Sequence, residues 1–178
     1  MKYLIAGPSG TGKTTVAAEL SKLGYLTIET DHEPELGSWT NLKSGERVPH
    51  NPPFSEEWLS QHKWLWQADV LKKLLDRQSA KQVFLIGGAA NATDFFDLFD
   101  KVFALSIDGS TMKHRLQNRK PERLVDPERW LDINPEIGQI LKWNDEFKEI
   151  YKSKGVVFID GSLPPGKIAE KIVEHINE

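Results

Sequence analysis

A glycine-rich loop between an apolar strand and an amphipathic helix is the feature that most restricts how this chain can fold. Residues 7–14 match the pattern G-x-x-x-x-G-K-[ST] at every specified position. The apolar residues 3–6 predict a short buried strand before the loop, and Val16, Ala17 and Leu20 recur after it at helical spacing. This order of strand, loop and helix predicts an α/β fold with the loop at the carboxyl end of its first strand.

The loop has the chemistry of an anion site. Its glycines allow backbone N–H groups to face an anion, and the helix that begins there adds its positive end. Lys13 supplies a point charge for outer phosphates, and the Thr14 hydroxyl can ligate magnesium. We therefore expect a nucleotide-phosphate site made of Gly7, Ser9, Gly10, Thr11, Gly12, Lys13, Thr14 and Thr15.

Length and charge bound the remaining possibilities. The 178 residues are enough for one domain with a sizeable core, and we expect a single domain over 1–178. A net charge of −3 gives no field that favours nucleic acid or an anionic membrane, so neither is expected as a partner. The absence of cysteine excludes disulfides and thiolate metal sites. No apolar stretch approaches the length of a membrane span, and we expect a cytoplasmic protein.

Strand and helix patterns alternate along the chain. Apolar runs predict strands at 3–6, 26–29, 83–86, 102–107 and 156–159. Helices are expected over 55–77 with a break near residues 62 and 63, after Asn91, over 111–118, from Pro135 with Asn134 as its cap, and from Pro165. Such alternation predicts a mostly parallel five-stranded sheet with helices on both faces.

Two regions depart from this alternation. Residues 30–54 are rich in Gly, Pro, Asn and charge and indicate an irregular insertion, which we extend to about 30–63. Residues 120–134 contain two prolines and several charges and indicate a small lid over about 119–134. Long loops in compact domains are usually functional or disordered. We interpret these two as functional, because they lie where a second substrate and a closing flap would be needed.

The surroundings of the loop favour transfer over hydrolysis. A GTPase needs an N-K-x-D element for base recognition, and the chain has none. A motor ATPase would be larger and would end an apolar strand in Asp or Asp-Glu to polarise water. Here the apolar strand at 83–86 ends in Gly87-Gly88-Ala89, without a carboxylate. This departure favours phosphoryl transfer to a bound acceptor.

With these features the chain resembles the small nucleotide- and shikimate-kinase group of adenylate-kinase-like P-loop kinases. It also resembles small bacterial proteins that are described only as kinase-like. The segments that carry the resemblance are the loop with Lys13 and Thr14, Glu29-Thr30-Asp31, Gly87-Gly88, the arginine-bearing stretch 115–129, and Ile159-Asp160-Gly161-Ser162. The resemblance implies a three-layer P-loop NTPase fold, ATP with Mg²⁺ as donor, a closing lid, and an acceptor pocket near the second strand.

Asp31 is the residue that we expect to act on the acceptor. At the end of the second strand, a carboxylate could orient or deprotonate an acceptor hydroxyl, or hold magnesium together with Thr14. A helix cap or a solvated loop acid is the alternative. Glu29 lies on a strand and can face either way, so its role stays open.

Arginines are expected to complete the site. Arg115 and Arg119 are four residues apart on one helix and share a face, and Arg123 follows in the lid. The resemblance implies that Arg115 and Arg119 contact the nucleotide, and that Arg119 and Arg123 act with Lys13 on the transferring phosphate. It also places Gly161 and Ser162 beside adenine. The alternative is that these arginines are surface charges without a role in the site. For Arg129 this alternative is the better interpretation.

Four of the six tryptophans lie in one part of the chain. Trp39, Trp58, Trp64 and Trp66 lie between the second and third strands, and Trp39 and Trp66 can either line an acceptor pocket or belong to the core. Arg47 and His50 are weak candidates for an anionic group of the acceptor. Asn91 serves either the acceptor or a helix cap.

These observations together predict an ATP-dependent small-molecule kinase. We expect transfer of the γ-phosphate to a hydroxyl or phosphate of a nucleoside or nucleoside monophosphate, by a monomer or homodimer. A nucleotide-binding regulatory or assembly protein with little turnover is the alternative.

Overall fold

The five predicted strands form one parallel sheet. In this computed structural model, which describes residues 1–48, 55–78, 81–118 and 133–177, the strands are β1 (Lys2–Ala6), β2 (Leu26–Glu29), β5 (Val83–Ile86), β6 (Lys101–Ser106) and β7 (Val157–Asp160). Their order in the sheet is β2-β5-β1-β6-β7, and every neighbouring pair is parallel. The predicted α/β fold with a five-stranded parallel sheet is therefore confirmed.

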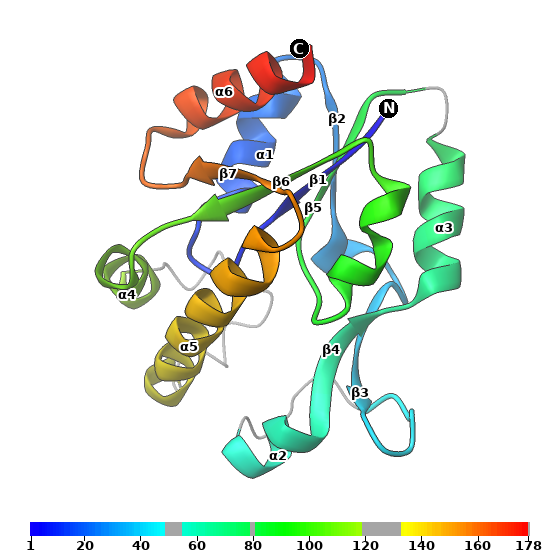
Figure 1. Cartoon of the computed structure of the whole chain (residues 1–178), viewed down its shortest axis with the longest axis vertical. Coiled ribbons are helices and arrows are strands. Elements are labelled where there is room, and N and C mark those ends of the chain that lie inside the picture. The colour runs from blue at the N-terminus through cyan, green and yellow to red at the C-terminus, as the bar shows by residue number, and fades with distance from the viewer. Residues whose placement is uncertain (49–54, 79–80, 119–132, 178) are drawn as a thin grey trace.

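Helices cover both faces of this sheet (Figure 1). Alternate residues of β1 illustrate how the strands divide: Tyr3 and Ile5 pack on one side, and Leu4 and Ala6 on the other. The first side meets α1 (Lys13–Lys22) and α6 (Pro165–Asn177). The second meets α3 (Ala68–Arg77), the 3₁₀ helix η2 (Ala92–Leu98) and α5 (Ile133–Lys152). The result is three layers with two apolar cores.

A third, smaller core joins α4 (Gly109–Gln117) to α5. It is made of Ile107, Met112, Leu116 and Ile137, all of them buried. Asp108 caps α4 by accepting from the backbone N–H of Thr111 at 2.8 Å. This packing places α4 beside the carboxyl end of β6, next to the glycine-rich loop that follows β1.

The insertion is more regular than the sequence indicated. Within it, the 3₁₀ helix η1 (Thr30–His32) is followed by β3 (Gly37–Asn41), α2 (Glu56–Gln61) and β4 (His62–Trp66). The strands β3 and β4 pair antiparallel and form a hairpin that projects below the main sheet in Figure 1. The helix predicted over 55–77 was therefore wrong at its centre, where the expected break at residues 62 and 63 begins a five-residue strand.

Other helix boundaries also differ from expectation. The helix after Asn91 is a 3₁₀ helix, and the asparagine side chain does not cap it. Within the described residues, α5 begins at Ile133, so Asn134 lies inside its first turn and is not its cap. The helices predicted at 111–118 and from Pro165 are confirmed as α4 and α6.

Candidate active site

The glycine-rich loop, residues 7–14 and hereafter the P-loop, connects β1 to α1 as the sequence predicted. Gly12 is the residue before the helix and has φ of 95°, a left-handed conformation that glycine adopts without strain. No side chain caps this end of α1, and its first turn holds no acidic residue. The first-turn N–H groups therefore remain for an external anion, which the positive end of the helix dipole also favours.

Side chains of the P-loop hold its curved shape. The Thr11 hydroxyl donates to the Pro8 carbonyl oxygen at 2.9 Å, and the Thr11 N–H reaches the same oxygen at 3.4 Å. The Lys13 ammonium donates to this oxygen too, at 3.1 Å, so the lysine lies along the loop. Thr14 and Thr15 are exposed at the start of α1. The predicted phosphate-binding residues are thus brought together at one end of the sheet.

A carboxylate from the next strand contacts the P-loop. The Thr14 hydroxyl donates to Glu29 Oε2 at 2.7 Å. The sequence left open which face of the sheet the Glu29 side chain points to. The alternation of side chains along β2 indicates this face. Leu26 and Ile28 pack on the α3 side, whereas the hydroxyl of Thr27 lies 2.8 Å from that of Ser21 on α1. Glu29 follows the same alternation toward α1.

Asp31 lies two residues further on, in η1, and its side chain is exposed. Between the two acids, Thr30 is only 2% exposed and donates to the Ile86 carbonyl oxygen at 3.3 Å. Gly87 makes room for it, because a Cβ at Gly87 would lie 1.8 Å from the Thr30 hydroxyl oxygen. Thr30 therefore anchors the end of β2 on β5, with an acid on either side of it.

Arg115 joins the P-loop to the turn between β7 and α6. Its Nη1 donates to the Gly161 carbonyl oxygen at 2.9 Å and to the carbonyl oxygens of Gly10 and Thr11 at 3.4 and 3.5 Å. In the same turn, Asp160 accepts from the Ser162 N–H at 2.8 Å. Hydrogen bonds from Ser162 lower the pKa of Asp160, and the charge of Arg115 lowers it further. The sequence predicted Arg115 at the nucleotide but not these backbone contacts.

Tryptophans of the hairpin and of α2 form an aromatic cluster. Trp39 meets Trp58 and Trp64 edge-on, with ring centroids 5.2 and 5.9 Å apart. Trp58 stacks on His62 at 4.0 Å. Trp66 is 2% exposed in the core beside α3, so of its two interpretations the structure favours the core. Trp39 is also buried, whereas Trp58 and Trp64 are half-buried.

Asn91 has a role that the sequence did not predict. Its side-chain oxygen accepts from the Trp66 N–H at 2.9 Å, and its amide nitrogen donates to the Trp66 carbonyl oxygen at 3.0 Å. The adjacent Ala90 N–H donates to the Trp64 carbonyl oxygen at 2.8 Å. Asn91 thus fastens the hairpin to the segment after β5, and both of its amide groups are used there.

Several predicted residues fall outside the described residues. These are Arg119, Arg123, Arg129, His50 and nearly all of the lid expected over about 119–134. Arg47 is described: it is exposed and forms an isolated bridge with Thr40 of β3. In the described part of the chain, no group of three or more Asp, Glu or His side chains could hold a metal ion.

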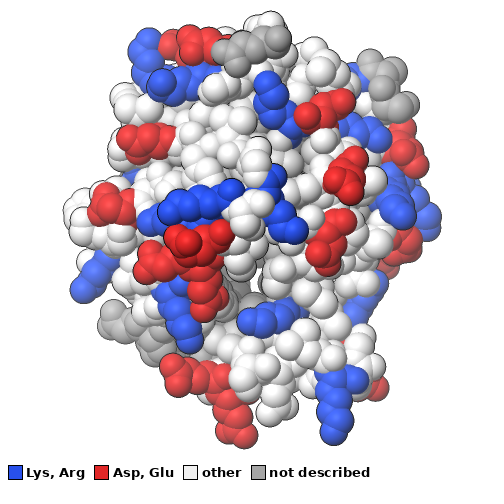
Figure 2. Space-filling model, in the orientation of Figure 1, with Lys and Arg blue, Asp and Glu red and all other residues white. Residues whose placement is uncertain are grey.

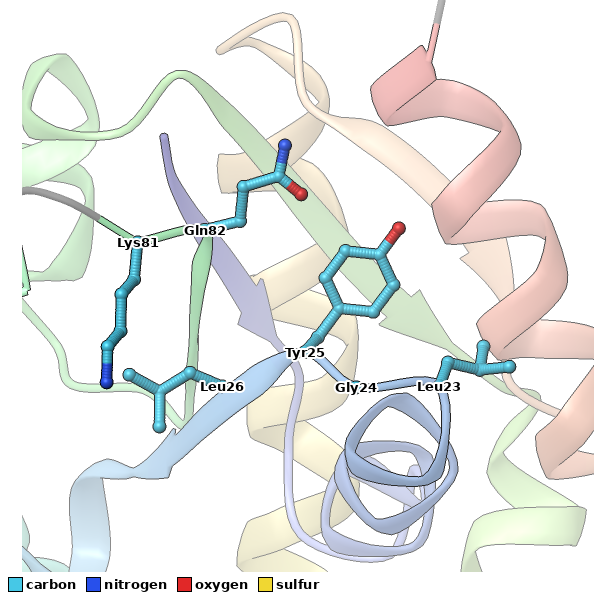
Figure 3. A pocket seen from close by; sticks show the side chains of 6 residues that line it. All are labelled: Leu23, Gly24, Tyr25, Leu26, Lys81 and Gln82. Atoms are coloured by element: carbon cyan, nitrogen blue, oxygen red, sulfur yellow. The ribbon is translucent and has the colours of Figure 1, made fainter.

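Two depressions lie away from the P-loop in the described part of the chain. A depression of about 290 Å³ lies at the amino ends of β2 and β5, opposite the P-loop, and Tyr25, Lys81 and Gln82 are among its lining residues (Figure 3). Another, of about 510 Å³, lies between Leu42 and Gln61 at the far end of the hairpin. Figure 2 shows acidic and basic side chains interspersed on the viewed face. No described helix has the length and apolarity to cross a membrane.

Comparison with known proteins gives a family and a fold. Residues 4–131 match the family described as AAA domain. No protein of curated function matches the sequence. A deoxyadenosine kinase from M. mycoides is 20% identical, with 100% of each chain covered and a TM-score of 0.57. A shikimate kinase from Aquifex aeolicus is 21% identical, with 99% of this chain and 96% of the other covered and a TM-score of 0.58.

A gluconokinase from Sinorhizobium meliloti is 17% identical, with 99% of this chain and 95% of the other covered and a TM-score of 0.55. At these identities the likeness shows a common fold. The three structures are small-molecule kinases by name, and each matches over nearly its whole length.

Proposed function

The chain belongs to the AAA-domain family and has the fold of small P-loop kinases, and from this premise we propose that it is an ATP-dependent small-molecule kinase. It transfers the γ-phosphate of ATP to a hydroxyl or phosphate of a small acceptor. The acceptor class we propose is a nucleoside or nucleoside monophosphate. The full-length match to the deoxyadenosine kinase supports this class, as do the half-buried side chains of Trp58 on α2 and Trp64 on β4.

The observation that carries the proposal is the grouping of donor and acceptor chemistry at one sheet edge. The uncapped start of α1 and Lys13 offer positive charge to phosphates. The pair Thr14–Glu29 and the exposed Asp31 offer oxygen atoms beside them. Phosphoryl transfer needs positioned cations around the phosphates and a carboxylate near the acceptor, and both are present here.

The pair Thr14–Glu29 fits magnesium. This ion prefers oxygen ligands, keeps several waters and needs only one or two protein groups. A hydroxyl and a carboxylate oxygen 2.7 Å apart meet that requirement. Thr14 would hold the ion, and Glu29 would hold it directly or through a bound water. When bound, magnesium neutralises charge on the outer phosphates. From the sequence we expected Asp31 to bind the metal together with Thr14. We now propose Glu29 for this role ahead of Asp31, because Glu29 contacts Thr14.

Asp31 is the proposed acceptor base. For a hydroxyl acceptor, its carboxylate accepts the proton as the acceptor oxygen bonds to the γ-phosphorus and the bond from that phosphorus to ADP breaks. Its exposure leaves the oxygens open to an acceptor. Arg119 and Arg123 remain proposed partners of the transferring phosphate, and Gly161 and Ser162 of the adenine. Ile86-Gly87-Gly88 at the end of β5 offers no carboxylate to activate water, which supports transfer over hydrolysis.

A panel assay tests this function. ADP release is measured with ATP and magnesium in the presence of nucleosides, nucleoside monophosphates and small sugar alcohols, one at a time. The proposal predicts release that depends on one acceptor class, is abolished in Lys13→Ala and falls by about 10²–10³ in Asp31→Asn. Glu35→Gln is the matched control, because it removes the same charge four residues away and leaves the rate unchanged. ATP binding without stimulation by any acceptor would instead identify a nucleotide-binding regulatory protein.

A further inference from the structure

The outer side of the P-loop has backbone carbonyl groups that need hydrogen-bond donors. A loop that turns its N–H groups toward an anion turns several of its C=O groups away from it. In this chain the carbonyl oxygens of Gly10 and Thr11 both lie within 3.5 Å of the Arg115 guanidinium. The same nitrogen, Nη1, also binds the Gly161 carbonyl oxygen at 2.9 Å. One arginine nitrogen therefore meets three carbonyl groups from two loops.

The packing around this contact is tight. A Cβ at Gly10 would lie 3.3 Å from Leu116 Cγ and 3.5 Å from Met112 Cγ, so the apolar face of α4 backs the P-loop. A Cβ at Gly161 would lie 3.0 Å from the Thr11 carbonyl oxygen, so the turn after β7 touches the P-loop directly. Leu116 and Met112 are both buried. The P-loop is thus held between α4 and this turn, with Arg115 where the three meet.

We propose that Arg115 is a positioning residue that ties the P-loop to the turn after β7, and that it acts on phosphate affinity through the shape of the loop. The inference rests on the proposed nucleotide binding. The planar guanidinium is suited to this role, because its donors are rigid, always charged and able to serve several acceptors at once. An ammonium at this position would keep the charge, but its stem is shorter and more flexible, so its donors would not be held rigidly at the three carbonyl groups.

The decisive comparison uses two ligands that share phosphates but differ in the base. Magnesium tripolyphosphate has no adenine, so a residue that only contacts the base cannot change its affinity. Isothermal titration with ATP and with tripolyphosphate would be made on the whole chain for wild type, Arg115→Ala and Arg115→Lys. Lys113→Ala is the matched control, since Lys113 is exposed on the same helix and loses the same charge.

The proposal predicts that Arg115→Ala weakens both ligands by the same factor, about 10–100-fold, the range for hydrogen bonds to a charged group. Arg115→Lys recovers only part of the loss, and Lys113→Ala binds both ligands as wild type does. The binding stoichiometry stays at the wild-type value in every variant. A mere folding defect would lower the stoichiometry and leave the affinity of the folded fraction unchanged.

Three results would overturn the inference. Loss of ATP affinity with unchanged tripolyphosphate affinity would assign Arg115 to the base. Wild-type affinity of Arg115→Lys for both ligands would show that a charge alone is sufficient. Unchanged affinity of Arg115→Ala for both ligands would show that the P-loop keeps its shape without Arg115. Failure of the wild-type chain to bind either ligand would reject the proposed function itself, and the inference with it.

Discussion

Gly87→Ala tests how the end of β2 is held in place. The new Cβ would lie 1.8 Å from the Thr30 hydroxyl oxygen and 3.0 Å from Thr30 Cβ. Thr30 is 2% exposed, so its side chain has no open space to enter. Either β2 moves away from β5 or the hydrogen bond from Thr30 to the Ile86 carbonyl breaks. Because Glu29 and Asp31 flank Thr30, a shift at this point also displaces both acids.

The expected cost follows from these contacts. Overpacking a buried site costs about 1–3 kcal/mol, and a lost hydrogen bond adds about 1 kcal/mol. The φ of 155° at Gly87 is a conformation that L residues rarely adopt, so alanine gains nothing there from restricting the unfolded chain. The expected free energy of unfolding is lower by about 1–3 kcal/mol from the overpacking, and by about 1 kcal/mol more where the hydrogen bond breaks. For a chain of this length that corresponds to a melting temperature lower by about 3–10 °C.

Urea denaturation of Gly87→Ala beside Gly88→Ala provides the measurement. A Cβ at Gly88 would meet nothing within 4 Å, so Gly88→Ala should be as stable as wild type or slightly more stable. In a Thr30→Ala background the cost of Gly87→Ala should shrink, because the hydroxyl oxygen is gone. The interpretation would be refuted by a Gly87→Ala midpoint equal to wild type, or by an equal loss in Gly88→Ala.

Three further predictions concern single contacts. Glu29→Gln should raise the magnesium concentration for half-maximal activity by about 10–100-fold, and an unchanged magnesium titration would remove Glu29 from the metal site. Asn91→Ala leaves the Trp66 N–H and C=O without their partner and should lower the free energy of unfolding by about 1–3 kcal/mol, in contrast to Asn118→Ala at the exposed end of α4. Hydrogen bonds from Ser110 and Thr111 hold the pKa of Asp108 well below its ordinary value of 3.8, so its stabilisation is full above that value and is lost as the pH falls through the folded-state pKa. The stability difference between wild type and Asp108→Ala should therefore be largest at neutral pH and shrink below about pH 4, whereas a constant difference would contradict the capping role.

The sequence predicted the parts of the fold whose signal is local. Four of the five parallel strands are mostly apolar, β2 alternates apolar and polar residues, and the P-loop pattern predicts where the first strand ends. The hairpin was missed because His62–Trp66 has only three apolar residues in a row and follows a short helix directly. What makes it a strand is pairing with Gly37–Asn41 and fastening by Asn91, which lie 21 or more residues away along the chain.

In the candidate site, too, the features with a local sequence signal could be predicted and the others could not. The residues of the P-loop could be predicted because their types are dictated by phosphate chemistry. The partner of Thr14 could have been found from the alternation of β2, since Thr27 and Glu29 share a side. The contacts of Arg115 could not, because they are made to backbone carbonyl groups, which any residue type supplies.

The most direct test of the proposed kinase follows the fate of the γ-phosphate. Phosphorus NMR of a reaction with ATP, magnesium and the best acceptor of the panel would quantify ADP, phosphorylated acceptor and inorganic phosphate. A kinase produces phosphorylated acceptor and ADP in equal amounts, and we expect Lys13→Ala to form neither. Inorganic phosphate equal to ADP, at a rate that does not depend on acceptor, would contradict the proposed function and make the chain a hydrolase.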